Sequence, residues 1–213
     1  MASTLSMASS ARVSMRGTAL RAKTSLVARA PLRAHRLTTR AAVKVGDEAP
    51  DFSLTGPAGD FASVSLPKSG KAVLAFFPAA FSGDADGGCE CQLNQLASVK
   101  AAGVPVIGIS KDSPFTMAKW AAATGDLTYV CDSDNAISEE YVGTFDLGAF
   151  LNNLGISKGF KYVCPNRGCV VVEDGKVVYT WIGQDETGPR PDLLPPIDEI
   201  MAAAGVSVEK KNF

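Results

Sequence analysis

The sequence contains a single histidine, His35, which lies in an N-terminal stretch that has no acidic residue before Asp47. The rest of the chain therefore has no imidazole to serve as a general base or as a metal ligand. This absence excludes Ser/His/Asp triads, Cys/His nucleophile pairs and His-ligated zinc there. An uninterrupted apolar run of about 18 residues is also missing, so the sequence predicts no membrane span.

The N-terminal stretch is rich in Ser, Thr and Ala and carries eight of the 21 basic residues. This composition is typical of an organelle transit peptide, and its basic residues recur too often to leave the apolar run of a secretory signal. We expect residues 1–41 to be a disordered plastid transit peptide that is cleaved, and the protein to reside in the chloroplast stroma. A basic arm that binds nucleic acid is the alternative, but no Phe, Trp or Tyr is interleaved for base stacking.

Loss of residues 1–40 would remove eight positive charges and no negative ones, which changes the formal net charge from −1 to −9. A nucleic-acid partner is therefore not expected. The cysteines all lie beyond this stretch, and there are five of them: Cys89, Cys91, Cys131, Cys164 and Cys169. An odd number in a compartment that keeps thiols reduced indicates reactive, metal-binding or buried thiols, rather than a disulfide scaffold.

Apolar runs and helical spacings alternate along the rest of the chain. Strands are expected at residues 64–66, 71–77, 104–109 and 127–131. Helices are expected from about Cys89 to Gly103, from Pro114 to about Ala123 after an N-cap at Ser113, and through Val142 after an N-cap at Asp134 or Asn135.

The pattern changes in the last third of the chain. Residues 146–162 are punctuated by Gly and Asn and indicate an insertion, and a turn at Gly175 joins residues 169–172 and 177–181 into a β-hairpin. A final helix is expected over residues 193–204. This order predicts an α/β protein of thioredoxin-like fold, with a central mixed β-sheet flanked by helices. Residues 43–204 would form the domain and residues 205–213 a C-terminal tail.

The chemistry is expected where the central strand ends and the next helix begins. Pro78 and Ser82 follow that strand, and Cys89 opens the helix. A thiol in the first turn of a helix lies near unsatisfied backbone N–H groups and the positive end of the helix dipole, both of which lower its pKa. Cys89 is therefore the predicted nucleophile.

These residues resemble the peroxiredoxin family, whose motif is Pro-x-x-x-Thr/Ser-x-x-Cys followed by x-x-Glu/Gln-Leu. The resemblance extends over about residues 43–204 and includes Pro165-Asn-Arg-Gly168 and the hairpin after it. One departure is clear: the family cysteine stands seven residues after the proline, where this chain has Ala85, so residues 83–88 contain four additional residues.

The resemblance implies an antioxidant enzyme that reduces hydrogen peroxide or organic hydroperoxides. In it Cys89 would attack the peroxide, Pro78 would shield the thiolate from water, Ser82 would hydrogen-bond the sulfur and the substrate, and Arg167 would keep the sulfur charged. Electrons would come from a thiol reductant such as thioredoxin or glutaredoxin. No organic cofactor and no metal are expected, and the oligomeric state stays open, a homodimer included.

Several roles remain for the other cysteines. Cys169 lies two residues after Arg167 on a predicted strand, so the two share a face, and Cys169 or Cys164 is a candidate to resolve a sulfenic acid. Cys91 could do so only if the helix unwound locally. Burial as small apolar residues is the alternative for Cys169 and the expectation for Cys131.

Two rival functions are compatible with the sequence. Cys89, Cys91, Cys164 and Cys169 could hold a metal ion, although neither pair has the usual zinc spacing. The second rival is a catalytically weakened redox sensor or adaptor subunit. Its docking surface would be the apolar residues of the insertion: Phe145, Leu147, Phe150, Leu151 and Leu154.

Overall fold

The computed structural model describes residues 42–82, 89–124, 127–186, 188–190 and 192–207, and of residues 89–92 it describes the backbone only. Seven strands form the main sheet: β1 (Ser53–Thr55), β2 (Ser63–Ser65), β3 (Lys71–Phe76), β4 (Val106–Ser110), β5 (Thr128–Cys131), β8 (Gly168–Glu173) and β9 (Lys176–Ile182). Two small sheets pair β6 (Thr144–Asp146) with β7 (Val163–Pro165), and β10 (Gln184–Asp185) with β11 (Gly188–Pro189). The helices are α1 (Cys89–Ala101), α2 (Pro114–Ala123), α3 (Ala136–Tyr141), α4 (Leu147–Asn153) and α5 (Ile197–Ala204).

The main sheet is mixed and has the strand order β2-β1-β5-β4-β3-β8-β9. Strands β3, β4 and β5 run parallel, and β8 joins β3 in the antiparallel sense. Because a core cluster covers each face of the sheet at β3, its residues Ala72 to Phe76 are buried, as the apolar run predicts. This strand therefore delivers the residues that follow it to the middle of one sheet edge.

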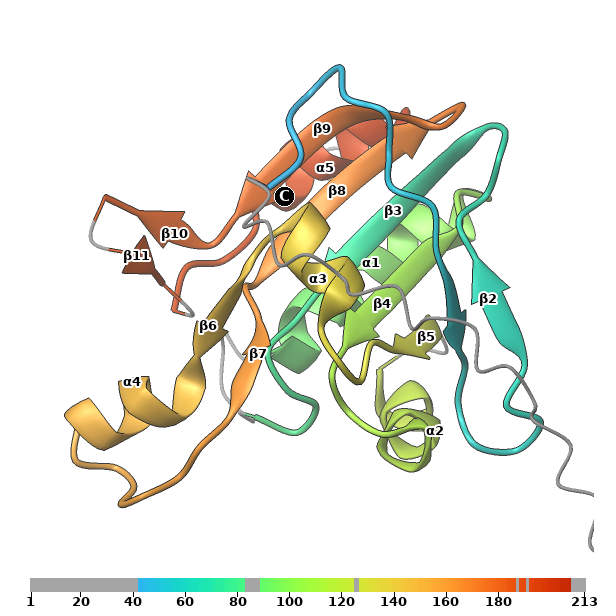
Figure 1. Ribbon diagram of the computed structural model, residues 1–213. Coiled ribbons are helices and arrows are strands. Elements are labelled where there is room, and N and C mark those ends of the chain that lie inside the picture. Colours follow the sequence, from blue (N-terminus) through green and yellow to red (C-terminus); the bar gives the residue numbers. More distant parts are fainter. Residues whose placement is uncertain (1–41, 83–88, 125–126, 187, 191, 208–213) are drawn as a thin grey trace, which may run out of the picture. The chain divides into compact units, whose positions relative to one another are not determined.

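Helices cover both faces of the sheet. In Figure 1, α1 and α5 lie behind it and α3 lies in front. Side chains from α1, α2 and α5, such as Leu96, Trp120 and Ile200, form one core cluster with Val73 and Phe77. Tyr141 and Val142 close the opposite cluster, over Phe76 and its neighbours. The prediction of a mixed sheet flanked by helices is confirmed.

Local signals account for the start of α2 and for the turn between β8 and β9. Ser113 caps α2 by accepting a hydrogen bond from the Thr116 amide, and Pro114 stands at the first helical position, as predicted. The β8–β9 turn places Asp174 and Gly175 at φ values of 50° and 80°, and a turn with positive φ at both central residues suits the twist of a hairpin.

One boundary prediction is wrong, and two other expectations gain detail in the structure. Helix α5 begins at Ile197 and not near residue 193, because each of the consecutive prolines at 195 and 196 disfavours helical backbone in the residue before it. The α3 N-cap position is Asn135, but its side chain makes no capping hydrogen bond. The buried Asp132 carboxylate accepts from the Ser138 amide and hydroxyl instead. Residues 146–162 also contain a helix, α4.

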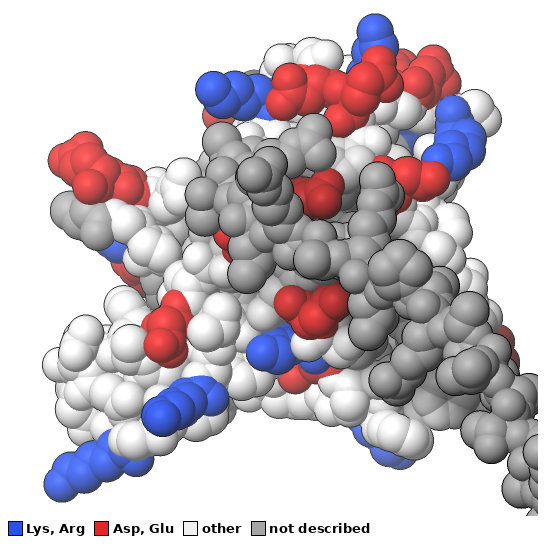
Figure 2. Space-filling view, viewed as in Figure 1, with Lys and Arg blue, Asp and Glu red and all other residues white. Residues whose placement is uncertain are grey.

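The face shown in Figure 2 carries acidic and basic side chains interspersed rather than one continuous basic field. None of the described helices combines the length and apolar character required to cross a bilayer.

Candidate functional site

The predicted site residues come from neighbouring strands of the sheet. Phe76, the last residue of β3, pairs with Gly168, the first residue of β8. Pro78 therefore follows β3 and Arg167 precedes β8 at the same edge. The carboxyl ends of β4 and β5 reach this edge as well, because both run parallel to β3.

The segment Pro78–Ser82 has a defined backbone. Pro78 is buried, and the Phe77 amide before it donates to the Ile109 carbonyl at 3.1 Å. The Ser82 hydroxyl is exposed and donates to the Ala79 carbonyl at 2.7 Å. Phe81 has a φ of 57° and packs edge-on against Trp120, with the ring centroids 4.8 Å apart. The segment is thus a compact turn between β3 and the residues that lead to α1.

Arg167 is buried in spite of its charge, with only 6% of its surface exposed. Its Nη1 donates to the Leu193 carbonyl at 3.3 Å, and its own carbonyl accepts from the Gly183 amide at 2.7 Å. A Cβ at Gly183 would lie 3.1 Å from the Arg190 carbonyl oxygen and 3.3 Å from the Arg167 carbonyl oxygen, so this close approach favours glycine. The backbone of Arg167 is consequently held at the edge where β3 ends, and its guanidinium contacts the segment that precedes α5.

Cys169 lies on the predicted face but inside the core. It stands between Ala75 and Trp181 in the sheet register and belongs to the cluster that α1 and α5 cover. Burial raises the pKa of its thiol to about 12, although the nearby positive charge of Arg167 acts in the opposite direction. The interaction with Arg167 agrees with the predicted shared face, and the burial favours a core role over a reactive one.

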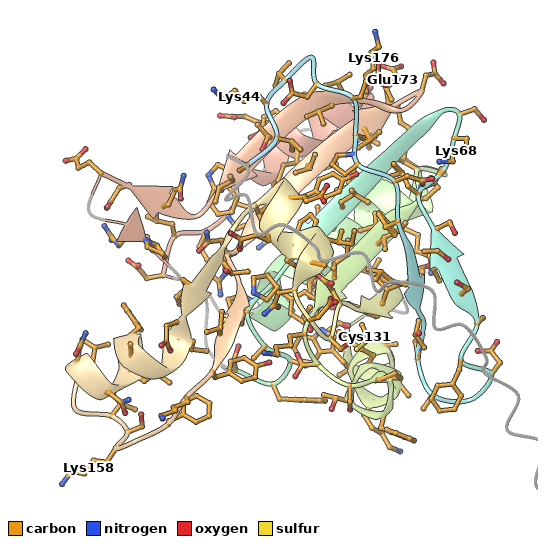
Figure 3. The ribbon with its side chains drawn as sticks, viewed as in Figure 1. Lys44, Lys68, Cys131, Lys158, Glu173 and Lys176 are labelled. Atoms are coloured by element: carbon orange, nitrogen blue, oxygen red, sulfur yellow. The ribbon has the colours of Figure 1, made fainter. Side chains whose placement is uncertain are left out.

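The other two described cysteines are also poor nucleophiles. Cys164, opposite Phe145 in the β6–β7 pair, is fully buried. Cys131, labelled in Figure 3, is the last residue of β5 and is half-buried, so the prediction that it belongs to the core is wrong. Burial, followed by the charges of Asp132, Asp112 and Asp134, raises the pKa of its thiol.

The two remaining cysteines lie at the start of α1, which confirms the predicted helix boundary at Cys89. The side chains of Cys89 and Cys91, and the whole of residues 83–88 with their additional residues, lie outside the described part of the chain. The reactivity of Cys89 and the resolving role of Cys91 stay predictions. Among the described residues, no group of three or more His, Cys, Asp or Glu side chains is arranged to hold a metal ion.

Sequence reasoning missed Asp112, which lies between β4 and α2. Its Oδ2 accepts a hydrogen bond from the Ala80 amide at 2.7 Å, inside the segment that follows β3. A polar residue directly after a buried parallel strand is a usable signal, because the carboxyl ends of parallel strands meet at one edge. The side-chain contact itself depends on the conformation of the Pro78–Ser82 turn, which the spacing does not give.

Most of the residues proposed as the docking surface of the insertion are buried or half-buried. Phe145 is 8% exposed, and Leu147, Phe150 and Leu151 are half-buried. Of that set, Leu154 alone is exposed, at 59%. The insertion projects to one side of the sheet with Lys158 at its outer end, as Figures 1 and 3 show. Most of the named residues are therefore not available for docking, although Ile156 and Phe160 of the same insertion are exposed, at 69% and 43%.

Comparison with known proteins gives a consistent result. Residues 44–194 match the Redoxin family. A thiol peroxidase of Bacillus subtilis (strain 168) is 28% identical over 164 residues, which cover 75% of this chain and 88% of that protein. A Coxiella burnetii protein assigned as peroxiredoxin bcp is 30% identical over 145 residues, or 65% of this chain and 88% of that protein.

A solved structure agrees on the fold. The peroxiredoxin-like protein from Aquifex aeolicus superposes with a TM-score of 0.58 at 21% identity, and the match covers 78% of this chain and 89% of that one. At this level of identity the likeness bears on the fold alone, and it confirms the predicted thioredoxin-like architecture.

Proposed function

The chain belongs to the peroxiredoxin family, and from this premise we propose that it reduces hydrogen peroxide or organic hydroperoxides with the Cys89 thiolate as nucleophile. The observation that carries the proposal is the buried Arg167, which lies just before β8 at the sheet edge where β3 ends. A permanent cation stabilises both a thiolate and the charge that develops as an O–O bond breaks. The first turn of α1 adds the positive end of a helix dipole.

In the first step the Cys89 sulfur attacks the terminal peroxide oxygen and a sulfur–oxygen bond forms. The O–O bond breaks, its electron pair leaves with the other oxygen, and that alkoxide or hydroxide takes a proton to become an alcohol or water. The sulfur is oxidised to a sulfenic acid and the peroxide is reduced. Ser82, at the end of the turn, would donate a hydrogen bond to the substrate once its hydroxyl rotates from the Ala79 carbonyl.

Reduction of the sulfenic acid requires a second thiol. Burial disfavours both Cys164 and Cys169 as internal attackers, because it keeps their sulfurs from the solvent. Burial also raises the pKa of the Cys169 thiol, and the neutral thiol is a weak nucleophile. We assign this step to an external thiol, such as thioredoxin or glutaredoxin, with Cys91 as the internal alternative. The sulfur of the external thiol forms a mixed disulfide with Cys89 and releases water, and a second thiol then regenerates Cys89 and leaves as a disulfide.

The test is peroxide consumption by the full chain with each thiol donor, together with mass spectrometry of the cysteines after addition of equimolar peroxide. Cys89→Ser is expected to abolish consumption, and Cys131→Ser, at the half-buried end of β5, is the matched control that should retain it. Oxidation recovered on Cys89 supports the proposal. Unchanged consumption by the Cys89→Ser variant would contradict it, and a wild-type chain inert to every peroxide would favour a sensor or adaptor.

The location of this activity is a separate proposal. The acid-free, Ser-rich composition of residues 1–41 supports import into the plastid. A fluorescent protein fused after this segment should colocalise with chlorophyll, and a fusion to the chain that starts at residue 42 should not. Retention of the first fusion outside the plastid would overturn the assignment.

A further inference from the structure

Asp112 makes a contact that joins the end of β4 to the turn after β3. Its Oδ2 accepts from the Ala80 amide at 2.7 Å and from the Ser110 hydroxyl at 2.8 Å, while its own amide donates to the Ser110 oxygen at 3.0 Å. Ser110 is completely buried. The Asp112 carboxylate is therefore held on its own side of the contact by hydrogen bonding to a buried residue.

The turn that receives this contact precedes the proposed nucleophile in the chain. The Phe77 amide ties its beginning to Ile109, and Phe81, at a φ of 57°, anchors its end on Trp120. Between these two anchors, Ala80 is held through Asp112. A backbone in the left-handed region is costly for a residue with a side chain, so the turn needs contacts of this kind to keep its conformation.

We propose that Asp112 is a positioning residue, whose carboxylate holds the Ala80 amide and thereby the Pro78–Ser82 turn in the conformation that peroxide reduction requires. The inference rests on the proposed function, because the turn carries Pro78 and Ser82. Asp112 itself has no contact with the reacting atoms in this account. It acts through the backbone of Ala80.

If Asp112 acts through its charge, removal of the charge should raise the activity. If it acts through its hydrogen bond, removal of the acceptor oxygen should lower the activity. A negative charge near a thiol disfavours the thiolate, so an electrostatic role alone would make any neutral variant faster. A positioning role requires only an acceptor oxygen in the same place. Asp112→Asn keeps such an oxygen without the charge, whereas Asp112→Ala has neither.

The experiment measures the rate constant for peroxide reduction in the full chain and in both variants. We expect Asp112→Ala to lower this rate constant by up to about 100-fold, because displacing a reacting group by about 1 Å has an effect of this size. The rate constant of Asp112→Asn should remain within a few-fold of wild type. Lys111→Met is the matched control, because the neighbouring lysine contacts Val163 and Tyr162 instead of the turn, and its rate should be unchanged. The inference would be overturned if both Asp112 variants reduced peroxide faster than wild type, or if both rate constants fell by the same factor.

Hydrogen exchange at the Ala80 amide separates this inference from the proposed function. The amide should be protected in wild type and in Asp112→Asn, and should exchange faster in Asp112→Ala. If wild type consumes no peroxide, the proposed function fails, and the exchange pattern still decides whether Asp112 holds the turn. An active enzyme whose Ala80 amide exchanges equally in all three chains would refute the role of Asp112 alone.

Discussion

In the proposed mechanism Arg167 supplies the positive charge of the site. Because the chain beyond residue 41 has no histidine, the positive charge beside the nucleophile must come from a guanidinium, an ammonium or a helix dipole. Arg167 is buried and its Nη1 donates to the Leu193 carbonyl, which makes it the most preorganised of these choices. Its contribution should therefore exceed that of an exposed arginine.

We predict that Arg167→Met lowers the rate constant for peroxide reduction by about 100-fold or more, the usual effect of removing one preorganised donor from an active site. The rate constant of Arg167→Lys should lie between those of Arg167→Met and wild type, because lysine keeps the positive charge but lacks the planar guanidinium. Initial rates over a range of peroxide concentrations measure both. Arg190→Met, which breaks an exposed pairing with Asp185 and Asp192, is the control and should keep the wild-type rate. Equal rates for the Arg167 and Arg190 variants would remove Arg167 from the mechanism.

Cys169 offers a second test at the scale of one residue. Its thiol is 3% exposed and burial raises its pKa to about 12, so it is neutral and inaccessible near pH 7.5. We predict that iodoacetamide modifies Cys89 in the native protein and leaves Cys169 untouched until the chain is unfolded. Peptide mass spectrometry over a time course gives the two rates. Modification of Cys169 as fast as Cys89 would show that this core opens readily and would revive Cys169 as a resolving thiol.

These residues illustrate what the sequence can and cannot predict about the site. The two-residue repeat of a strand is enough to place Arg167 and Cys169 on one face. The exposure of Cys131 is not predictable in the same way, because it depends on where β5 ends. The contact of Asp112 could not be predicted for a related reason. Its partner is the backbone amide of Ala80, which lies in a turn whose conformation is known only from the folded chain.

Helix α3 shows the same limit at the scale of an element. Local pattern favours Asp134 or Asn135 as its cap, and Asn135 does stand at that position. The capping carboxylate belongs to Asp132, which is completely buried at the end of β5 and accepts from the Ser138 amide and hydroxyl at 2.7 and 2.6 Å. Burial raises the pKa of this carboxyl, and the hydrogen bonds from Ser138 oppose that rise.

We predict that Asp132→Ala lowers the free energy of unfolding by about 2–4 kcal/mol, because it leaves buried donors of Ser138 without an acceptor. Asp132→Asn should cost less, since its oxygen still accepts and it carries no charge to desolvate. Urea unfolding followed by circular dichroism gives both values. The control is Asp134→Ala, whose exposed side chain accepts only from the Ala136 amide and whose loss should cost about 1 kcal/mol or less. A larger effect at Asp134 than at Asp132 would mean that the helix is capped locally after all.

For the whole molecule, alternation of strands and helices predicts the architecture but not the strand order. The apolar run at residues 71–77 predicts a buried strand. Nothing in the local sequence predicts that β3 pairs with β8, which comes much later in the chain. That pairing is set by which apolar faces can be covered together. Helix α5 completes the arrangement, since Ile200, Met201 and Ala204 share a core cluster with β3, β8 and α1.

Because the last helix covers the first central strand, we predict that the domain unfolds as one cooperative unit. Ile200 is fully buried, and Ile200→Ala should lower the free energy of unfolding by about 3 kcal/mol and the Tm by roughly 6–12 °C. Leu194→Ala, at a side chain that is 53% exposed, is the control and should change the stability by less than about 0.5 kcal/mol. Thermal unfolding followed by far-UV circular dichroism and by Trp fluorescence should give coincident transitions in both variants. An early transition in circular dichroism alone would mean that α5 detaches before the sheet unfolds, and that the core on this face is stable without it.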